Sequence, residues 1–154
     1  MPERLRWKPE GRAGLSDRVS KRKRAAMGMS GFRILANVAV SDLARARDFY
    51  EGKLGLAVRA VRGDGGVTYD CGEGTSLHIY SSPANAGLSQ ATQAGWVTPD
   101  IDAAAAELAA AGVVFESYDS EELTTDEKGI ATMGDARAAW FKDPDGTILG
   151  LITS

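Results

Sequence analysis

Cysteine and histidine are almost absent from this sequence, which has one of each, Cys71 and His78. A lone cysteine cannot close an internal disulfide, so the sequence excludes a disulfide-stapled scaffold and favours a reducing compartment, most simply the cytoplasm. No apolar run approaches the ~18 residues of a membrane-spanning helix, and no apolar signal segment stands near the N-terminus. We therefore expect a cytoplasmic protein without a membrane partner.

Positive charge is scarce outside the first residues. Residues 1–29 carry a net charge of +6 and residues 30–154 a net charge of −9. Residues 1–30 show no helical or strand period and are rich in Arg, Lys, Gly and Pro, which predicts a flexible basic tail. The remainder, 31–153, is predicted to be one acidic domain, for which a nucleic-acid partner is not expected.

One pattern of elements occurs twice, at a spacing of 58 residues. Ser41 or Asp42 suits the start of one helix and Asp100 the start of another, because a short side-chain oxygen can accept a hydrogen bond from a free backbone N–H there. The first unit reads as a strand, a helix and three strands at 32–40, 41–55, 56–62, 66–72 and 75–81. The second reads in the same order at 93–99, 100–112, 113–118, 136–142 and 147–152. The repeat predicts an α+β fold of two βαβββ modules, 31–82 and 92–153.

Two turn-rich segments interrupt the second module. Asp143-Pro144-Asp145-Gly146 joins its last two strands, and Asp, Pro and Gly suit the first, second and fourth positions of a type I turn. We interpret this motif as turn geometry rather than chemistry. Residues 119–135 are acidic and turn-rich, and we expect a longer excursion there at the edge of a pocket.

Two motifs carry a family resemblance. "VAVSDLARARDFYEGKLGL" in the first module and "WFKDPDGTILGLI" in the second resemble the vicinal oxygen chelate superfamily of glyoxalases, bleomycin-resistance proteins and extradiol dioxygenases. The resemblance implies a mixed sheet curled around a cleft. It also implies a metal site made by four side chains from the first and last strands of each module.

The four positions that the resemblance implies for metal ligands are poorly equipped in this chain. In that family the first-strand ligands lie seven residues before the helix-start Asp, and the final ligand lies four residues after the Gly of the turn. The four positions therefore hold Leu35, His78, Gln93 and Gly150. A catalytic zinc site keeps three protein ligands, but only His78 and Gln93 have side-chain lone pairs here. We predict a vestigial site with no metal and no cofactor, in which Gly150 leaves room for a wider ligand.

Strand alternation selects the residues expected to face the cleft. With the implied ligand positions turned inward, the hydrogen-bonding residues Asn37, His78, Tyr80 and Gln93 are predicted to bind a ligand. His78 is the best catalytic candidate, because imidazole alone has an ordinary pKa near neutrality. A histidine that only lines the cleft and bonds to a neighbour is the alternative.

Three functions follow as hypotheses. The first is metal-independent binding or sequestration of a small, partly apolar or aromatic molecule. The alternative is a metal-dependent lyase, isomerase or dioxygenase of the glyoxalase type, with its site completed by Asp70, Glu116 or Asp135. A third is an interaction subunit, since relatives of this kind often form homodimers. The sequence leaves open whether any reaction is catalysed.

Overall fold

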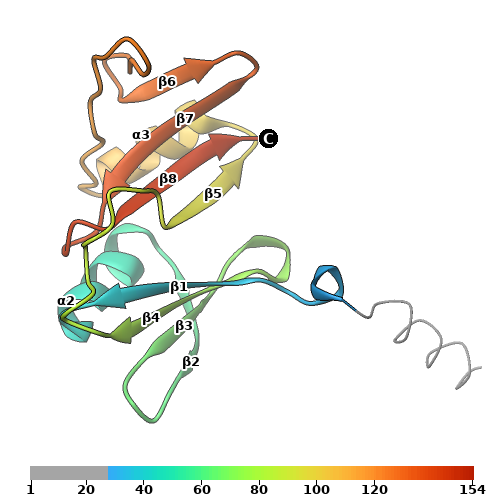
Figure 1. The fold of residues 1–154 in the computed structure, drawn as a ribbon, viewed down its shortest axis with the longest axis vertical. Coiled ribbons are helices and arrows are strands. Elements are labelled where there is room, and N and C mark those ends of the chain that lie inside the picture. Colours follow the sequence, from blue (N-terminus) through green and yellow to red (C-terminus); the bar gives the residue numbers. More distant parts are fainter. Residues whose placement is uncertain (1–27) are drawn as a thin grey trace, which may run out of the picture. The chain divides into compact units, whose positions relative to one another are not determined.

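The computed structural model describes residues 28–154. Its first module is a four-stranded mixed sheet with helical segments between its first two strands (Figure 1). The sheet order is β1-β4-β3-β2, with β1 parallel to β4 and the other neighbours antiparallel. Its elements are β1 (Leu35–Val40), α2 (Leu43–Arg47), the π-helical η2 (Asp48–Lys53), β2 (Ala57–Val61), β3 (Val67–Asp70), the 3-10 turn η3 (Gly72–Gly74) and β4 (Ser76–Ser81). A further 3-10 turn, η1 (Met29–Gly31), precedes them.

The second module repeats this plan. Its sheet order is β5-β8-β7-β6, with β5 parallel to β8 and the remaining neighbours antiparallel. Its elements are β5 (Ala94–Thr98), α3 (Ile101–Ala110), β6 (Ile130–Met133), β7 (Ala136–Lys142) and β8 (Ile148–Thr153). No helix of the described residues is long and apolar enough to cross a membrane. The predicted α+β fold of two βαβββ modules is confirmed.

The helix starts lie where the two aspartates indicated. Asp42 accepts a hydrogen bond from the Arg45 backbone at 3.0 Å, and Asp100 accepts one from Ala103 at 3.0 Å. Each bond satisfies a backbone N–H that the first helical turn leaves without a partner. The helix expected over 41–55 is in fact divided, because its hydrogen bonding changes from α to π after Arg47.

The strand predicted at 113–118 is wrong. That segment makes only an isolated bridge between Phe115 and Phe141, and the strand beside β7 is β6, inside the excursion expected at 119–135. Met133 pairs with Ala136 across a two-residue turn whose Gly134 has φ +62°. β6 pairs with β7 from Ala136 to Ala139, and Phe115 pairs beyond it with Phe141, so the two segments share this edge of β7. The two-residue turn closes the β6–β7 hairpin at a small entropic cost.

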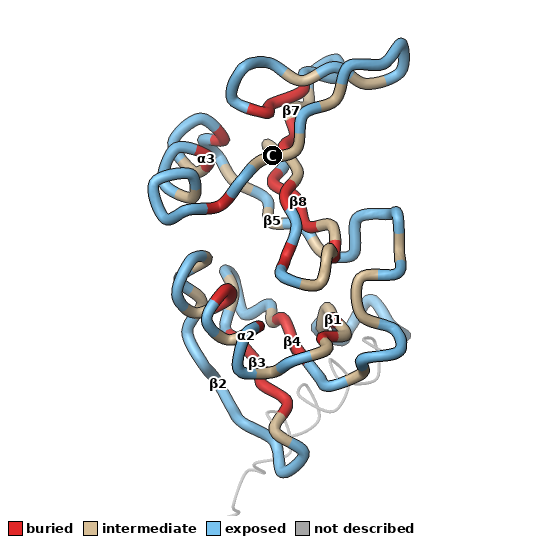
Figure 2. The backbone as a smooth tube through the Cα atoms, turned by 90° about the vertical axis from the view of Figure 1, so that its left-hand side faces the viewer, coloured by how far each residue is buried: buried red, intermediate tan, exposed pale blue. Residues whose placement is uncertain are grey.

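The hydrophobic core combines residues of the helices with the strand residues that alternation turns to the helix side. Figure 2 shows buried stretches along β3, β4, β7 and β8. Val38, Val40, Leu77 and Ile79, assigned to that side by strand alternation, are at most 2% exposed. Ile34, assigned to the same side, is 81% exposed and lies outside the core. Residues Ile34–Ser154 form one compact unit. The tail predicted over 1–30 lies, up to residue 27, outside the described residues.

The Asp143–Gly146 turn of the second module is hydrogen-bonded to the first helical region of the first module. Tyr50 donates its hydroxyl hydrogen bond to the buried Asp143 Oδ2 at 2.9 Å. Asp145 accepts from the Ser41 backbone and hydroxyl and from Arg45 Nη2, the last at 2.9 Å. The motif predicted to be a turn therefore also makes polar contacts between the modules.

Candidate ligand-binding pocket

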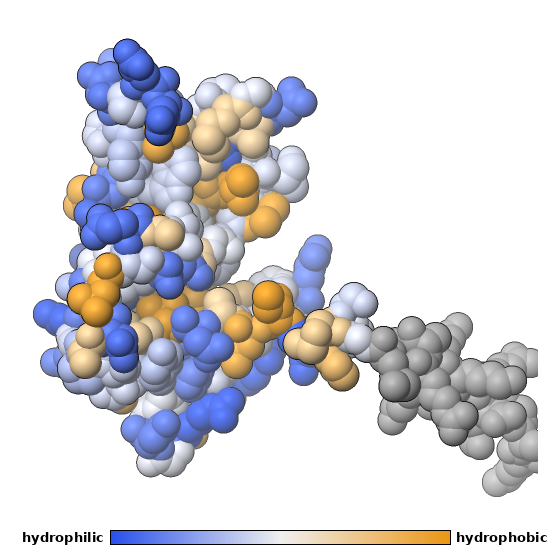
Figure 3. Space-filling view, viewed as in Figure 1, coloured by the Kyte–Doolittle hydropathy of each residue, from blue (hydrophilic) through white to orange (hydrophobic). Residues whose placement is uncertain are grey.

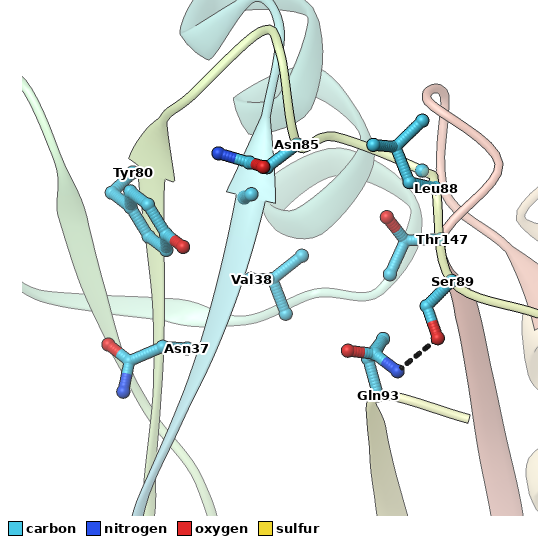
Figure 4. A pocket seen from close by; sticks show the side chains of 10 residues that line it. Asn37, Val38, Tyr80, Asn85, Leu88, Ser89, Gln93 and Thr147 are labelled. Carbon is cyan, nitrogen blue, oxygen red and sulfur yellow. Dashed lines mark hydrogen bonds between the residues drawn. The ribbon is translucent and has the colours of Figure 1, made fainter. Parts of the chain in front are cut away.

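One pocket of the described residues lies where β1, β4 and the start of the second module approach each other (Figure 4). Its cavity volume is about 200 Å³, below the ~300–1,000 Å³ of pockets that enclose drug-sized ligands. Three of the four residues predicted to bind a ligand, Asn37, Tyr80 and Gln93, are in its wall. The full lining is Asn37, Val38, Ala39, Tyr80, Asn85, Gly87, Leu88, Ser89, Gln93 and Thr147.

Sheet register places the first-module residues of the wall. β1 and β4 run parallel, with Asn37 opposite His78 and Ala39 opposite Tyr80. Alternate residues of a strand share a face, so Asn37 and Ala39 reach the same side as Tyr80. Gln93 stands just before β5, and its backbone N–H donates to Ile148 O at 2.8 Å. The wall is thus built on paired strands at its two sides.

The segment between the modules completes the wall, which the sequence reasoning missed. Asn85, Gly87, Leu88 and Ser89 all line the pocket, and Leu88 is 68% exposed. The available signal was position, since a short polar linker between two modules that share a site is a common place for binding residues. Thr147, directly after the turn motif, was missed as well.

Hydrogen bonds fix how two of the amide side chains are turned. Asn37 Nδ2 donates to Leu35 O at 3.3 Å, and Gln93 Nε2 donates to Ala91 O at 3.0 Å and to Ser89 Oγ at 2.9 Å. A backbone carbonyl can only accept, so the nitrogen end of each amide must face it. Figure 4 shows the Gln93 oxygen turned away from Ser89.

The pocket wall contains no side chain that is charged at neutral pH. Its polar groups are amides and hydroxyls, and its apolar groups are Val38, Ala39 and Leu88. The Tyr80 ring adds an aromatic face and is stacked on His78, with centroids 6.3 Å apart and planes 6° from parallel. This mixture can hold an apolar ring and orient its polar substituents.

His78 does not line the pocket. It is 7% exposed, and its Nδ1 lies 2.9 Å from Thr68 Oγ1 on the neighbouring strand. Gly66 covers the other side of the ring, where an added Cβ would come within 3.1 Å of Nε2. Burial lowers the pKa of His78, the charge of Arg62 lowers it further, and Asp64 acts in the opposite direction.

The four positions implied for metal ligands do not fit a resident metal. Leu35 and Gly150 have no side-chain atom that could ligate a metal. The Nδ1 atom of His78 is hydrogen-bonded to Thr68, and the Gln93 nitrogen donates a hydrogen bond to Ser89. Only Gln93 of the four lines the pocket. The space beside Gly150 admits a methyl group and little more, because a Cβ there would make ordinary van der Waals contacts with Trp140 Cδ1 and Thr92 Cγ2 at 3.5 and 3.6 Å.

The carboxylates considered as substitute ligands are held elsewhere. Asp70 pairs with Arg59 at the edge of the first sheet, and Glu116 lies 3.6 Å from Lys142 in the second module. Asp135 is exposed in the turn between β6 and β7. Within residues 28–154, no three His, Cys, Asp or Glu side chains form a group that could hold a metal ion.

Comparison with protein families gives one match. A family model described as the Glyoxalase/Bleomycin resistance protein/Dioxygenase superfamily matches residues 33–151. No curated protein matches the chain.

Solved structures resemble this one over most of its length. An antibiotic binding protein from Streptomyces sp. CB03234, TnmS3, is 27% identical with a TM-score of 0.60, covering 79% of this chain and 94% of its own. A glyoxalase/bleomycin resistance protein from the same organism is 28% identical with a TM-score of 0.59, covering 78% and 98%. A protein of that description from Catenulispora acidiphila is 24% identical with a TM-score of 0.59, covering 80% and 98%, and supports the fold alone.

Proposed function

This chain belongs to the Glyoxalase/Bleomycin resistance protein/Dioxygenase superfamily, and within it we propose that the protein binds or sequesters a small, partly apolar or aromatic molecule without a metal ion. The observation that carries this proposal is the pocket wall, which combines Asn37, Tyr80 and Gln93 with apolar side chains and contains no His, Cys, Asp or Glu. One similar structure is named as an antibiotic binding protein, which supports a ligand of that general kind.

The shortage of metal ligands supports binding over metal-dependent catalysis. A catalytic zinc site needs about three protein ligands, and magnesium or manganese sites need carboxylates. Of the four implied positions, Leu35 and Gly150 have no side-chain atom that could ligate a metal, and His78 is buried against Thr68. No observation of the described residues favours the glyoxalase-type enzyme in its place.

Equilibrium dialysis against Zn²⁺, Ni²⁺ and Fe²⁺ tests the metal-independent part of the proposal. We expect no stoichiometric, tight uptake by the full chain. Tight binding of one ion per chain that disappears in His78→Ala would contradict the proposal. Arg62→Ala, a substitution near His78 that removes no metal ligand, controls for general disturbance of this region.

Calorimetric titration with a panel of aromatic antibiotics tests ligand binding itself. We expect at least one compound to bind, with the same affinity before and after addition of a chelator. Tyr80→Ala should weaken that binding, because it removes the aromatic face of the pocket. Absence of binding by every member of a broad aromatic panel would favour an interaction subunit.

A homodimer remains a prediction from the sequence. Apolar side chains of Val58, Val61, Val97 and Ile152 are between 39% and 67% exposed, and Figure 3 shows apolar surface among hydrophilic surface. Apolar surface of this kind is what an association between copies would bury. Light scattering on a sizing column should give twice the chain mass of 16.3 kDa. A mass of one chain at all concentrations would argue against the dimer.

A further inference from the structure

We propose that the pocket selects its ligand by the hydrogen bonds which the ligand donates. The ligand class is an uncharged aromatic molecule with hydroxyl or amide N–H groups, and carboxylates and phosphates are disfavoured. This inference rests on the proposed binding function and specifies the chemistry of the molecule bound. It follows from how Asn37 and Gln93 are held and from the charges absent from the wall.

Asn37 is turned with its amide nitrogen towards the backbone, which leaves its carbonyl oxygen as an unbonded acceptor. Its Nδ2 is directed to the backbone oxygen of Leu35, so turning the amide over would bring two acceptors together. Among the described residues, no donor is bonded to Asn37 Oδ1. One Nδ2 proton is directed to Leu35 O, so Asn37 presents at the pocket its unbonded carbonyl oxygen together with the second amide proton.

The Gln93 amide is also turned with its nitrogen towards the protein, and two hydrogen bonds hold it where Asn37 has one. Its Nε2 donates to both Ala91 O and Ser89 Oγ, which uses the two protons of the amide. Within residues 28–154, Gln93 Oε1 has no donor. Two modules thus each contribute one amide oxygen to the same pocket, and each oxygen can be satisfied by a donor of the ligand.

Charge leads to the same class of ligand. No Lys or Arg lines the pocket to compensate a bound anion, and residues 30–154 carry a net charge of −9. No Asp or Glu lines it either, so a bound cation would lose its hydration without gaining an ion pair. Uncharged donors, such as phenol hydroxyls, suit two carbonyl oxygens beside the Tyr80 ring.

Three naphthalene probes of similar size separate these possibilities. They are 2,6-dihydroxynaphthalene, which donates, 2,6-dimethoxynaphthalene, which only accepts, and 2,6-naphthalenedicarboxylate, which is an anion. Calorimetric titration of the full chain should give about a tenfold lower Kd for the dihydroxy compound than for the dimethoxy compound, since roughly one net hydrogen bond corresponds to that factor. The dicarboxylate should bind more weakly than either.

Gln93→Leu tests the residue, and Gln90→Leu is its matched control. Leucine keeps much of the shape of glutamine and removes the amide oxygen. The roughly tenfold difference in Kd between the dihydroxy and dimethoxy probes should therefore largely disappear in Gln93→Leu. Gln90 is exposed and outside the pocket wall, so Gln90→Leu should retain the preference. Circular dichroism establishes that both variants fold, and Asn37→Leu provides a second variant from the other module.

The outcomes distinguish the two proposals. Equal affinity for the dihydroxy and dimethoxy probes, or a preference for the dicarboxylate, overturns the inference while binding itself stands. A preference that survives in both Gln93→Leu and Asn37→Leu overturns the assignment to these oxygens. No binding by any of the three naphthalenes overturns this inference, whereas the broad antibiotic panel decides the proposed function separately.

Discussion

At the scale of single residues, His78 illustrates how a chemically competent side chain becomes structural. Imidazole was the natural candidate for a base or a metal ligand in this chain. Thr68 engages its Nδ1 at 2.9 Å, and Gly66 allows the backbone of the β2–β3 turn to cover the ring. Its role is therefore to support the β3–β4 pair and the Tyr80 ring stacked on it.

We expect His78 to titrate below its ordinary pKa of 6.5, because burial disfavours the imidazolium. The unfolded chain then binds the proton more readily, so the free energy of unfolding decreases as the pH falls below about 6.5. Since His78 is the only histidine, its ring protons can be followed by NMR without assignment ambiguity. A measured pKa above 6.5 would show that the folded protein stabilises the charged form instead.

Gly66→Ala should destabilise the fold by about 1–3 kcal/mol, because its Cβ would lie 3.0 Å from His78 Cε1 and 3.1 Å from Asp64 Oδ1. Gly63→Ala in the same turn is the control, since no atom lies within 4 Å of its added Cβ. Urea denaturation compares the two variants. Equal stability of both would mean that the imidazole is not confined beneath Gly66.

At the scale of elements, the Asp143–Gly146 turn and the first helical region determine how the modules meet. Asp143 is buried and accepts from Tyr50 Oη and from the backbone of Asp145 and Thr147. Burial raises the pKa of Asp143, while these hydrogen bonds act in the opposite direction. The contact also holds Thr147 beside the pocket, so the turn motif contributes to the position of the binding wall.

Tyr50→Phe should lower the free energy of unfolding by about 1.5–3 kcal/mol, because it leaves a buried carboxyl without one of its donors. Tyr69→Phe is the matched control. Its hydroxyl donates to Glu51, which is partly exposed, so water can replace the lost bond and the loss should be about 0.5–1.5 kcal/mol. Chemical denaturation measures both, and a larger loss for Tyr69→Phe would contradict the role given to Asp143.

At the scale of the whole unit Ile34–Ser154, one hydrophobic core joins the two modules. The cluster includes Val38 and Ile79 from the first module and Ile101 and Leu149 from the second. Phe49 and Phe141 meet across it, with ring centroids 6.4 Å apart. A shared core means that neither module buries its apolar face alone, so the modules should fold together.

We expect both modules to unfold in one transition. After Trp7→Phe, fluorescence comes from Trp96 and Trp140, which are both in the second module, whereas His78 reports on the first. Urea midpoints from tryptophan fluorescence and from the His78 NMR signal should coincide. Two separated midpoints would show that the modules are independent and that the shared core contributes little.

The sequence by itself determined the doubled α+β fold, because the evidence for it is local and periodic. Asp42 and Asp100 cap their helices by accepting from backbone N–H groups only three residues away. Strand alternation likewise assigns Val38 and Leu77 to the core from neighbouring residues alone. The position of β6 was not determined, since Phe115 and β6 lie along the same edge of β7 and only the folded chain shows how they divide it.

Only the tertiary structure decided the character of the site. Sequence spacing placed Asn37, Tyr80 and Gln93 on inward faces, but it could not show that Thr68 and Gly66 enclose His78 or that Trp140 borders the space beside Gly150. It also could not show how each amide is turned, because Leu35 O and Ala91 O make that choice. These properties depend on atoms from different strands meeting within a few ångströms, and residue order alone does not fix such distances.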